Sequence, residues 1–147
     1  MRVILAEKPS VAQNIAAVLG ADQKKNGYLQ GENDLVSWCI GHLIELAPPE
    51  IYDARYAKWR REDLPIVPSA WESVVSDGTK KQFAVLKDLL NRTDVDEVVC
   101  ATDAGREGEL IFRMVYEKTG CTKPVKRLWI SSLEESAIRE GFRSLKP

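Results

Sequence analysis

The stretch that most constrains the fold of this 147-residue chain lies between residues 98 and 112. Residues 98–101 are apolar and rich in β-branched side chains, which is typical of a strand covered on both faces, as in a parallel sheet. Beyond Asp103 the apolar spacing becomes helical, and the expected core-facing stripe consists of Leu110, Ile111, Met114 and Val115. A strand that turns straight into a helix predicts an α/β fold, with Asp103 at the carboxyl end of the strand, where open sheets bind ligands.

Two acids and an arginine gather at this turn. We expect Glu107, in the first turn of the helix, to share the side of the apolar stripe and to point back toward Asp103. Two carboxylates there would repel each other unless a cation lay between them, and Mg²⁺ accepts one or two carboxylates while keeping waters that a phosphate can replace. Gly105 and Gly108 allow close approach of backbone and ligand, and Arg106 offers a planar donor to a phosphate. Alternatively, Asp103 caps the helix and the glutamates only complement its dipole.

The N-terminus repeats this strand, acid and helix pattern. Residues 2–6 form a short apolar run that predicts a central strand, and Glu7 and Lys8 follow it directly. Pro9 suits the first turn of a helix, which Gly20 should end. Glu7 would then emerge at the same edge of the sheet as Asp103, although the Glu7 and Lys8 pair is also compatible with an ordinary surface position.

Residues 21–75 have the pattern of a hairpin and loop insertion. The hairpin is expected within residues 23–40, and the prolines between residues 47 and 68 exclude a long helix there. Basic and aromatic side chains alternate in this loop: Arg55, Tyr56, Lys58, Trp59, Arg60 and Arg61. They could follow a nucleic-acid backbone and stack on a base. Alternatively, Tyr52, Tyr56 and Trp59 cover the sheet.

The remaining elements complete the α/β pattern. An amphipathic helix is expected from residue 79 to 90, a strand over residues 125–130 with Arg127 inside it, and a final helix after residue 134. His42 is the only histidine, and both a structural and a functional role are open for it.

Composition limits the class of protein. The net charge of −1 does not indicate a polyanion partner for the whole molecule, so any nucleic-acid surface must be local. Cys39, Cys100 and Cys121 lack CxxC spacing and are interpreted as packed, reduced thiols rather than disulfides or a zinc site. No signal pattern or long apolar span occurs, so we expect a cytoplasmic chain without membrane contact.

Four motifs in this order resemble a known family: residues 6–10, 41–43, 103–109 and 126–132. Together they resemble the N-terminal Toprim domain of bacterial type IA DNA topoisomerases, most closely the topoisomerase III group. The resemblance implies a Rossmann-like domain with a mainly parallel central sheet flanked by helices. It also implies that residues 1–147 form a single Toprim domain, a fragment of a longer multidomain enzyme.

The resemblance further implies a function, the breaking and rejoining of a single DNA strand. Glu7 matches the family's catalytic glutamate, a general acid and base, and Lys8 matches the lysine that holds the scissile phosphate. Glu7, Asp103 and Glu107 would hold Mg²⁺. The residues expected to contact DNA are Lys8, Arg106, Arg127 and His42.

The sequence departs from the family pattern in two ways. Gly105 stands where many relatives carry a middle aspartate, which predicts a weaker or more water-coordinated cation. None of the four tyrosines, Tyr28, Tyr52, Tyr56 and Tyr116, lies in a motif that matches the nucleophile. The fragment is therefore expected to be inactive alone. We also expect it to be monomeric, and the resemblance implies single-stranded DNA and the remaining domains of the parent enzyme as partners.

Two other functions remain open from the sequence. One is a self-sufficient Toprim nuclease or primase-like enzyme that uses Glu7, Asp103 and Glu107 without a tyrosine. The other is a non-catalytic module that recruits a partner through the basic loop.

Overall fold

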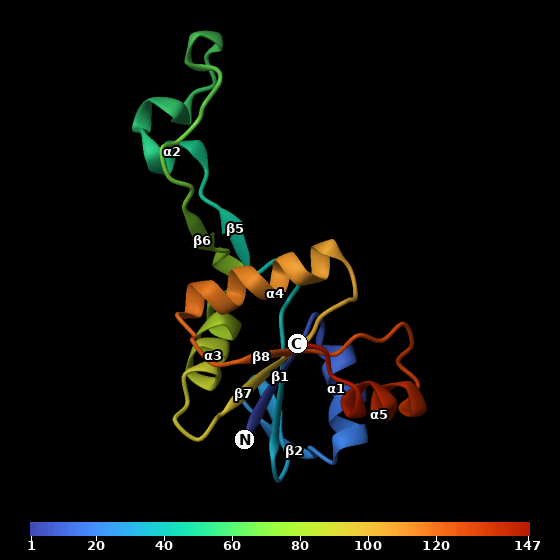
Figure 1. The fold of residues 1–147 in the computed structure, drawn as a ribbon. Coiled ribbons are helices and arrows are strands. Elements are labelled where there is room, and N and C mark those ends of the chain that lie inside the picture. Colours follow the sequence, from blue (N-terminus) through green and yellow to red (C-terminus); the bar gives the residue numbers. More distant parts are fainter.

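A computed structural model describes all 147 residues as a six-stranded sheet with helices on both faces and a projecting arm (Figure 1). The strand order is β2-β3-β4-β1-β7-β8. The strands are β1 (Arg2–Ala6), β2 (Gln23–Lys25), β3 (Tyr28–Gln30), β4 (Asp34–Trp38), β7 (Glu97–Ala101) and β8 (Val125–Arg127). β1 runs parallel to both β4 and β7, and β7 runs parallel to β8, whereas β2, β3 and β4 pair in antiparallel fashion. The predicted α/β fold with a mainly parallel central sheet is confirmed.

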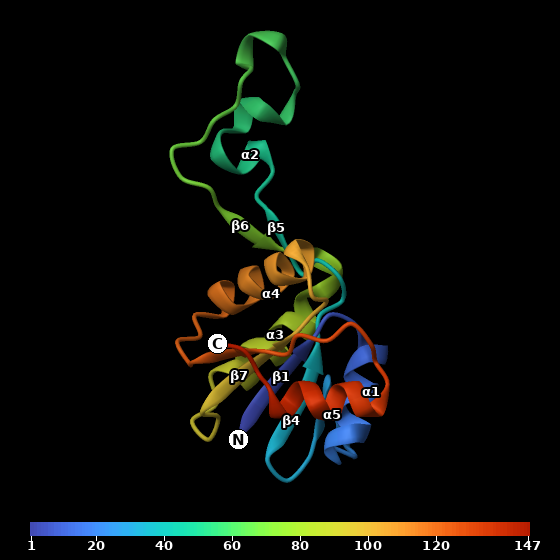
Figure 2. The same ribbon diagram turned by 45° about the vertical axis from the view of Figure 1, so that its right-hand side comes forward.

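The alternation of side chains along β1 explains why both faces of the sheet carry helices. Val3 and Leu5 belong to one core cluster, while Ile4 and Ala6 belong to the other, because successive residues of a strand point to opposite faces. The first cluster includes residues of α3 (Lys80–Leu90) and α4 (Arg106–Thr119); the second includes residues of α1 (Pro9–Leu19) and α5 (Glu135–Arg143). Figure 2 shows these two pairs of helices on either side of the sheet.

Helix α4 differs in one respect from the predicted stripe. Ile111 and Val115 are buried as expected, but Phe112 is fully buried while Leu110 is 50% exposed. The helix turns Phe112 into the core cluster on its side of the sheet and leaves Leu110 at the rim of two surface hollows. The prediction that Leu110 packs on the sheet is therefore wrong.

Helix α1 has the predicted ends. Pro9 lies in its first turn, and Gly20 follows its last residue with φ of 71°, the left-handed conformation that glycine adopts without a steric penalty. The N–H of Gly20 is directed at the carbonyls of Ala16 and Ala17.

The arm is a second, separate unit of the fold. Its base is a two-stranded antiparallel sheet of β5 (Ile44–Leu46) and β6 (Ser73–Val75), and its outer part holds α2 (Pro49–Tyr52) and the 3₁₀ turns η1 (Ala54–Ala57) and η2 (Arg61–Asp63). A further 3₁₀ turn, η3 (Asp77–Thr79), leads into α3. Figures 1 and 2 show the arm extending away from the body.

The structure thus gives residues 21–75 two different settings. The β2–β4 portion lies in the central sheet, and only residues 44–75 leave it. Trp59 lies on the outer arm with 78% of its surface exposed, so the alternative in which Trp59 covers the sheet is wrong.

All three cysteines are buried and free, which confirms the interpretation of packed thiols. No helix has both the length and the apolar character needed to cross a membrane.

Candidate active site

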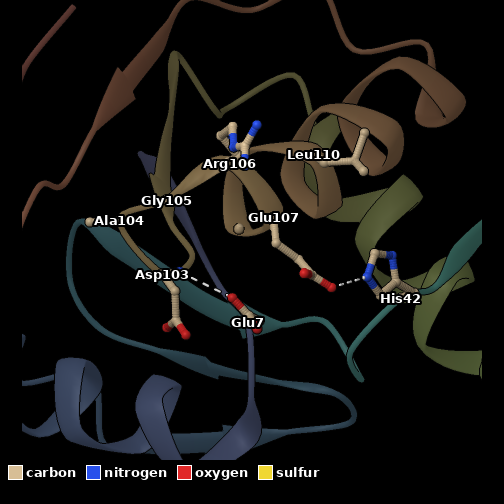
Figure 3. Close-up of a pocket in the computed structure, with 9 residues that line it drawn as sticks. Glu7, His42, Asp103, Ala104, Gly105, Arg106, Glu107 and Leu110 are labelled. Carbon is tan, nitrogen blue, oxygen red and sulfur yellow. Dashed lines mark hydrogen bonds and ion pairs between the residues drawn. The ribbon is translucent and has the colours of Figure 1, made fainter.

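The site begins with two acids at the carboxyl ends of adjacent strands. The register pairs Ala6 of β1 with Ala101 of β7, so Glu7 and Asp103, one and two residues further on, emerge at the same edge. The backbone N–H of Asp103 donates a hydrogen bond to Oε2 of Glu7 at 3.2 Å (Figure 3). The sheet therefore brings together two residues that are 96 positions apart in the chain.

Glu107 takes a direction that the sequence did not predict. It lies in the first turn of α4, but its Oε1 is 2.8 Å from Nε2 of His42 rather than turned toward Asp103 (Figure 3). His42 comes from the turn just before β5, so this contact connects the base of the arm to the start of α4. Both side chains are solvent-accessible, which leaves the pair free to exchange for other partners.

These side chains surround an open cavity of about 800 Å³. Glu7, His42 and Leu110 line it together with residues 103–108. No serine, threonine, cysteine or tyrosine is among its lining residues. The cavity therefore offers acids, an imidazole and backbone N–H groups, but no hydroxyl or thiol nucleophile.

Two exposed cations lie at this edge. Lys8 follows Glu7 and precedes α1, and Arg106 is the first residue of α4 and lines the cavity. Neither side chain makes a hydrogen bond or an ion pair within the protein. Both are thus available to an anionic ligand.

Arg127 has a different setting, because only 8% of its surface is exposed. Its Nη2 donates to the carbonyl oxygen of Asp103 at 2.6 Å, and its Nη1 donates to Oγ1 of Thr102 at 3.0 Å and to Sγ of Cys100 at 2.6 Å. From its buried position, the guanidinium therefore holds the backbone of Asp103 in place. The direct DNA contact expected of Arg127 stays a prediction.

Thr102 is a further structural member of the site that the sequence did not single out. Its hydroxyl donates to the carbonyl of Gly108 at 2.7 Å, which ties the end of β7 to the first turn of α4. The backbones of Gly108 and Asp103 lie so close together that a Cβ on Gly108 would be 2.1 Å from the carbonyl oxygen of Asp103. A hydroxyl directly before the acid, at the end of an apolar strand, was the available signal for this tie.

The space around residue 105 does not require a glycine at that position. Its backbone is extended, with φ of −173°, and an added Cβ would meet no atom within 4 Å. The fold would therefore accommodate a side chain such as aspartate at this position.

The donor set suits a hard divalent cation, because Glu7, Asp103 and Glu107 all line one cavity and offer only carboxylate oxygens. The geometry is not preassembled: no group of three or more histidine, cysteine, aspartate or glutamate side chains is arranged to hold a metal ion. One oxygen of Glu7 already accepts from the Asp103 N–H and one oxygen of Glu107 is paired with His42, which leaves the second oxygen of each carboxylate for a cation.

A buried thiol lies close behind the site. Burial, followed by the negative charge of Glu7 and the proximity of Cys100, raises the pKa of the Cys39 thiol to about 12. Cys39 thus remains protonated and contributes no thiolate ligand at neutral pH.

Comparison with known proteins shows which protein family this chain resembles in sequence. Residues 2–133 match the Toprim domain family. The chain is 53% identical to DNA topoisomerase 3 of Bacillus cereus and 54% identical to DNA topoisomerase 3 of Shouchella clausii, each over 145 residues. Both alignments cover 99% of this chain and 20% of the relative, so the chain spans about a fifth of the length of these relatives.

A solved structure has a similar fold. The full-length topoisomerase I of Thermotoga maritima superposes with a TM-score of 0.62, over 98% of this chain and 21% of that chain, at 23% identity. At that identity the likeness concerns the fold alone.

Proposed function

Since this chain belongs to the Toprim domain family, we propose that it is the Toprim part of a type IA DNA topoisomerase of the topoisomerase III group. Such an enzyme is an isomerase that breaks and rejoins a single DNA strand. The observation that carries the proposal is the meeting of Glu7 and Asp103 at the ends of adjacent parallel strands, beside an open cavity. Residues 1–147 would form one Toprim domain within a longer enzyme, as the 20% coverage of the relatives supports.

Glu7 is proposed as the proton-transfer residue. Its carboxylate lines the cavity and already accepts one hydrogen bond, so it is positioned to take a proton from an attacking hydroxyl and to return one to a leaving oxygen. Lys8 is next to it, exposed and unpaired, and would offset the charge that develops on the phosphate.

Glu7, Asp103 and Glu107 are the residues that would hold Mg²⁺. When bound, the ion would supply positive charge to offset that of a DNA phosphate. Oε1 of Glu107 is paired with Nε2 of His42, so Glu107 would offer its other oxygen to the ion. A turn of this carboxylate away from His42 would free Nε2 to donate to a phosphate oxygen.

The other residues proposed to contact DNA differ in how far their side chains are exposed to solvent. Lys8 and Arg106 present unpaired cations to solvent, which suits contact with the backbone of a single-stranded segment. Arg127 is placed behind this edge, so we assign it the positioning of the Asp103 backbone in addition to the DNA contact predicted from the family.

The nucleophile must come from elsewhere. No tyrosine lines the cavity, and transfer of a strand to an enzyme hydroxyl requires one within reach of the phosphate. The isolated chain is therefore proposed to lack strand-passage activity. We propose separately that it is a monomer.

The test is a chimera in which this chain replaces the matching region of the Bacillus cereus DNA topoisomerase 3, to which it is 53% identical. The chimera should relax negatively supercoiled plasmid in the presence of Mg²⁺, and the same chimera with Glu7→Gln should not. The isolated chain should be inactive in the same assay.

One result would favour the nuclease alternative instead. If the isolated chain cuts labelled DNA or RNA with Mg²⁺ or Mn²⁺ and leaves no covalent protein adduct, then no external tyrosine is needed and the topoisomerase assignment is wrong.

A further inference from the structure

A second cavity adjoins the one that holds Glu7 and Glu107, which we call the acid cavity. Its volume is about 470 Å³, and it is lined by Val11 and Ile15 of α1, by residues 101–104 and by residues 128–133. We call it the loop pocket, because residues 128–133 belong largely to the connection between β8 and α5. Residues 103 and 104 line both cavities, so a ligand bound at the acid cavity can extend into the loop pocket.

The lining of the loop pocket differs chemically from that of the acid cavity. Eight of its twelve lining residues are hydrophobic, and Asp103 is the only charged one. Ile15 and Leu128 belong to the buried core, whereas Ser131 is exposed and Ser132 is half-buried. An apolar lining with a few hydroxyl groups offers too few polar partners for a phosphate or a metal ion. It suits a flat ring that has polar atoms at its edge.

The loop that forms one wall of the pocket is fixed by the elements around it. The N–H of Glu134 donates to the hydroxyl oxygen of Ser132 at 3.2 Å, just before α5 begins. A Cβ on Gly141 would lie 2.6 Å from the side chain of Ile130, so α5 packs directly against the loop. The loop pocket is therefore formed before any ligand arrives.

Trp129 is the aromatic member of this wall, and 54% of its surface is exposed. The guanidinium carbon of Arg127 lies 5.7 Å from the centroid of its ring, and Nζ of Lys146 lies 5.5 Å from it. These contacts restrain the ring and place positive charge beside the pocket. An aromatic side chain next to cations is the combination by which proteins bind single-stranded nucleic acid, through base stacking and backbone contact.

The position of the pocket relative to Lys8 favours a base as its occupant. Lys8, which is proposed to contact the phosphate, directly precedes α1, and Val11 of the first turn of that helix lines the pocket. A base is joined to its phosphate through a single sugar. A phosphate held beside Lys8 and Asp103 therefore keeps the attached base within reach of the pocket, and the bases of a single strand are unpaired and free to enter it.

We propose that the loop pocket binds the base of a nucleotide next to the phosphate that is cleaved, and so determines which bases the enzyme prefers at that position. The apolar walls, Trp129 and Leu133 among them, would cover the ring, and the hydroxyl of Ser131 would hydrogen-bond to its edge. The inference rests on the proposed function, because that function supplies the DNA phosphate at the acid cavity.

The first experiment titrates the isolated chain, labelled at its methyl groups, with a tetranucleotide of single-stranded DNA in the presence of Mg²⁺. NMR signals of the pocket methyl groups of Val11, Ile15 and Leu133 should shift. A tetranucleotide with the same sugar–phosphate backbone but no bases should leave these signals unchanged and still shift the amides of Lys8 and Arg106. Its affinity should be lower by about fivefold or more, the typical loss when one base stacking contact is removed.

A variant tests whether the pocket itself provides this preference for bases. Trp129→Ala should weaken binding of the complete tetranucleotide but not of the one without bases. The matched control is Trp59→Ala, which removes an exposed tryptophan outside the pocket and should leave both affinities unchanged. In the chimera described above, sequencing of cleaved strands should show a base preference next to the break that Trp129→Ala alters and Trp59→Ala does not.

Three outcomes would overturn the inference. The first is pocket methyl groups that respond equally to the two tetranucleotides, and the second is the absence of any response at millimolar concentration. The third is a chimera in which these methyl signals are already shifted before DNA is added, because a segment of protein would then fill the pocket.

The results also separate this inference from the proposed function. An active chimera whose pocket does not respond to bases contradicts the inference alone. A pocket that responds to bases in a folded but inactive chimera contradicts the proposed function and leaves the base-binding pocket supported.

Discussion

Glu7 and Asp103 meet through a hydrogen bond of 3.2 Å from the backbone N–H of Asp103 to the carboxylate of Glu7. The contact depends on the parallel register of β1 and β7, which aligns the residues that precede the two acids. Beneath it, Arg127 holds the carbonyl of Asp103, and Gly108 lets α4 start directly against that carbonyl. The geometry of the site edge is therefore a property of the buried scaffold.

Gly108→Ala should destabilise the chain. The new methyl group would lie 2.1 Å from the carbonyl oxygen of Asp103, so the loop or the helix must shift, at a cost of about 1–3 kcal/mol. Urea unfolding followed by circular dichroism measures this change. Gly105→Ala is the matched control, since its methyl group meets nothing within 4 Å, and its free energy of unfolding should not fall. Equal destabilisation by the two substitutions would show that the close approach at Gly108 does not hold the loop.

Arg127→Leu should reduce the free energy of unfolding by about 2–4 kcal/mol, because it leaves the Asp103 carbonyl and the Thr102 hydroxyl without their buried donor. Lys126→Ala, at the neighbouring and less buried position, should change it by less than about 0.5 kcal/mol. If Arg127→Leu unfolds like the unmodified chain but weakens DNA binding in the chimera, then Arg127 acts through DNA and not through the loop.

Gly105→Asp should strengthen Mg²⁺ binding by about tenfold or more, since it adds a carboxylate at a position that lines the acid cavity and has room for a side chain. Isothermal titration calorimetry of the isolated chain measures the affinity. Gly105→Asn has almost the same shape without the charge and should not reproduce the gain. An equal effect of both substitutions would mean that the added side chain acts by rigidifying the loop.

The three thiols should be silent toward Ellman's reagent in the folded chain at pH 8. All are buried, and burial together with the charge of Glu7 raises the pKa of Cys39 to about 12. The folded chain keeps the Cys39 proton to a higher pH than the unfolded chain does. The contribution of this thiol to the free energy of unfolding is therefore complete below the ordinary thiol pKa of 9.0, and it is lost as the pH rises from there toward 12. Absorbance at pH 8 should report three thiols only after denaturant is added; rapid reaction of a thiol in the folded chain would contradict the burial.

The placement of Glu7 and Asp103 at one edge of the sheet could be predicted from the sequence, because the apolar runs at residues 2–6 and 98–101 are each followed closely by an acid. Glu107 could not be oriented in this way, since its partner His42 comes from the base of the arm, 65 positions away. Leu110 and Phe112 point to nearly opposite sides of α4, because two residues turn a helix by about 200°, and only the position of the sheet decides which of them is buried. The burial of Arg127 could not be predicted either, because it depends on acceptors from β7 and the following loop.

The most direct test of the central claim, that Glu7, Asp103 and Glu107 form one cation-binding edge, is a Mg²⁺ titration of the isolated chain followed by amide NMR. Shifts should centre on these three residues at millimolar Mg²⁺ and should disappear in Asp103→Asn, which keeps the shape of the side chain but removes its charge. An absence of shifts, or shifts that persist unchanged in Asp103→Asn, would contradict the claim.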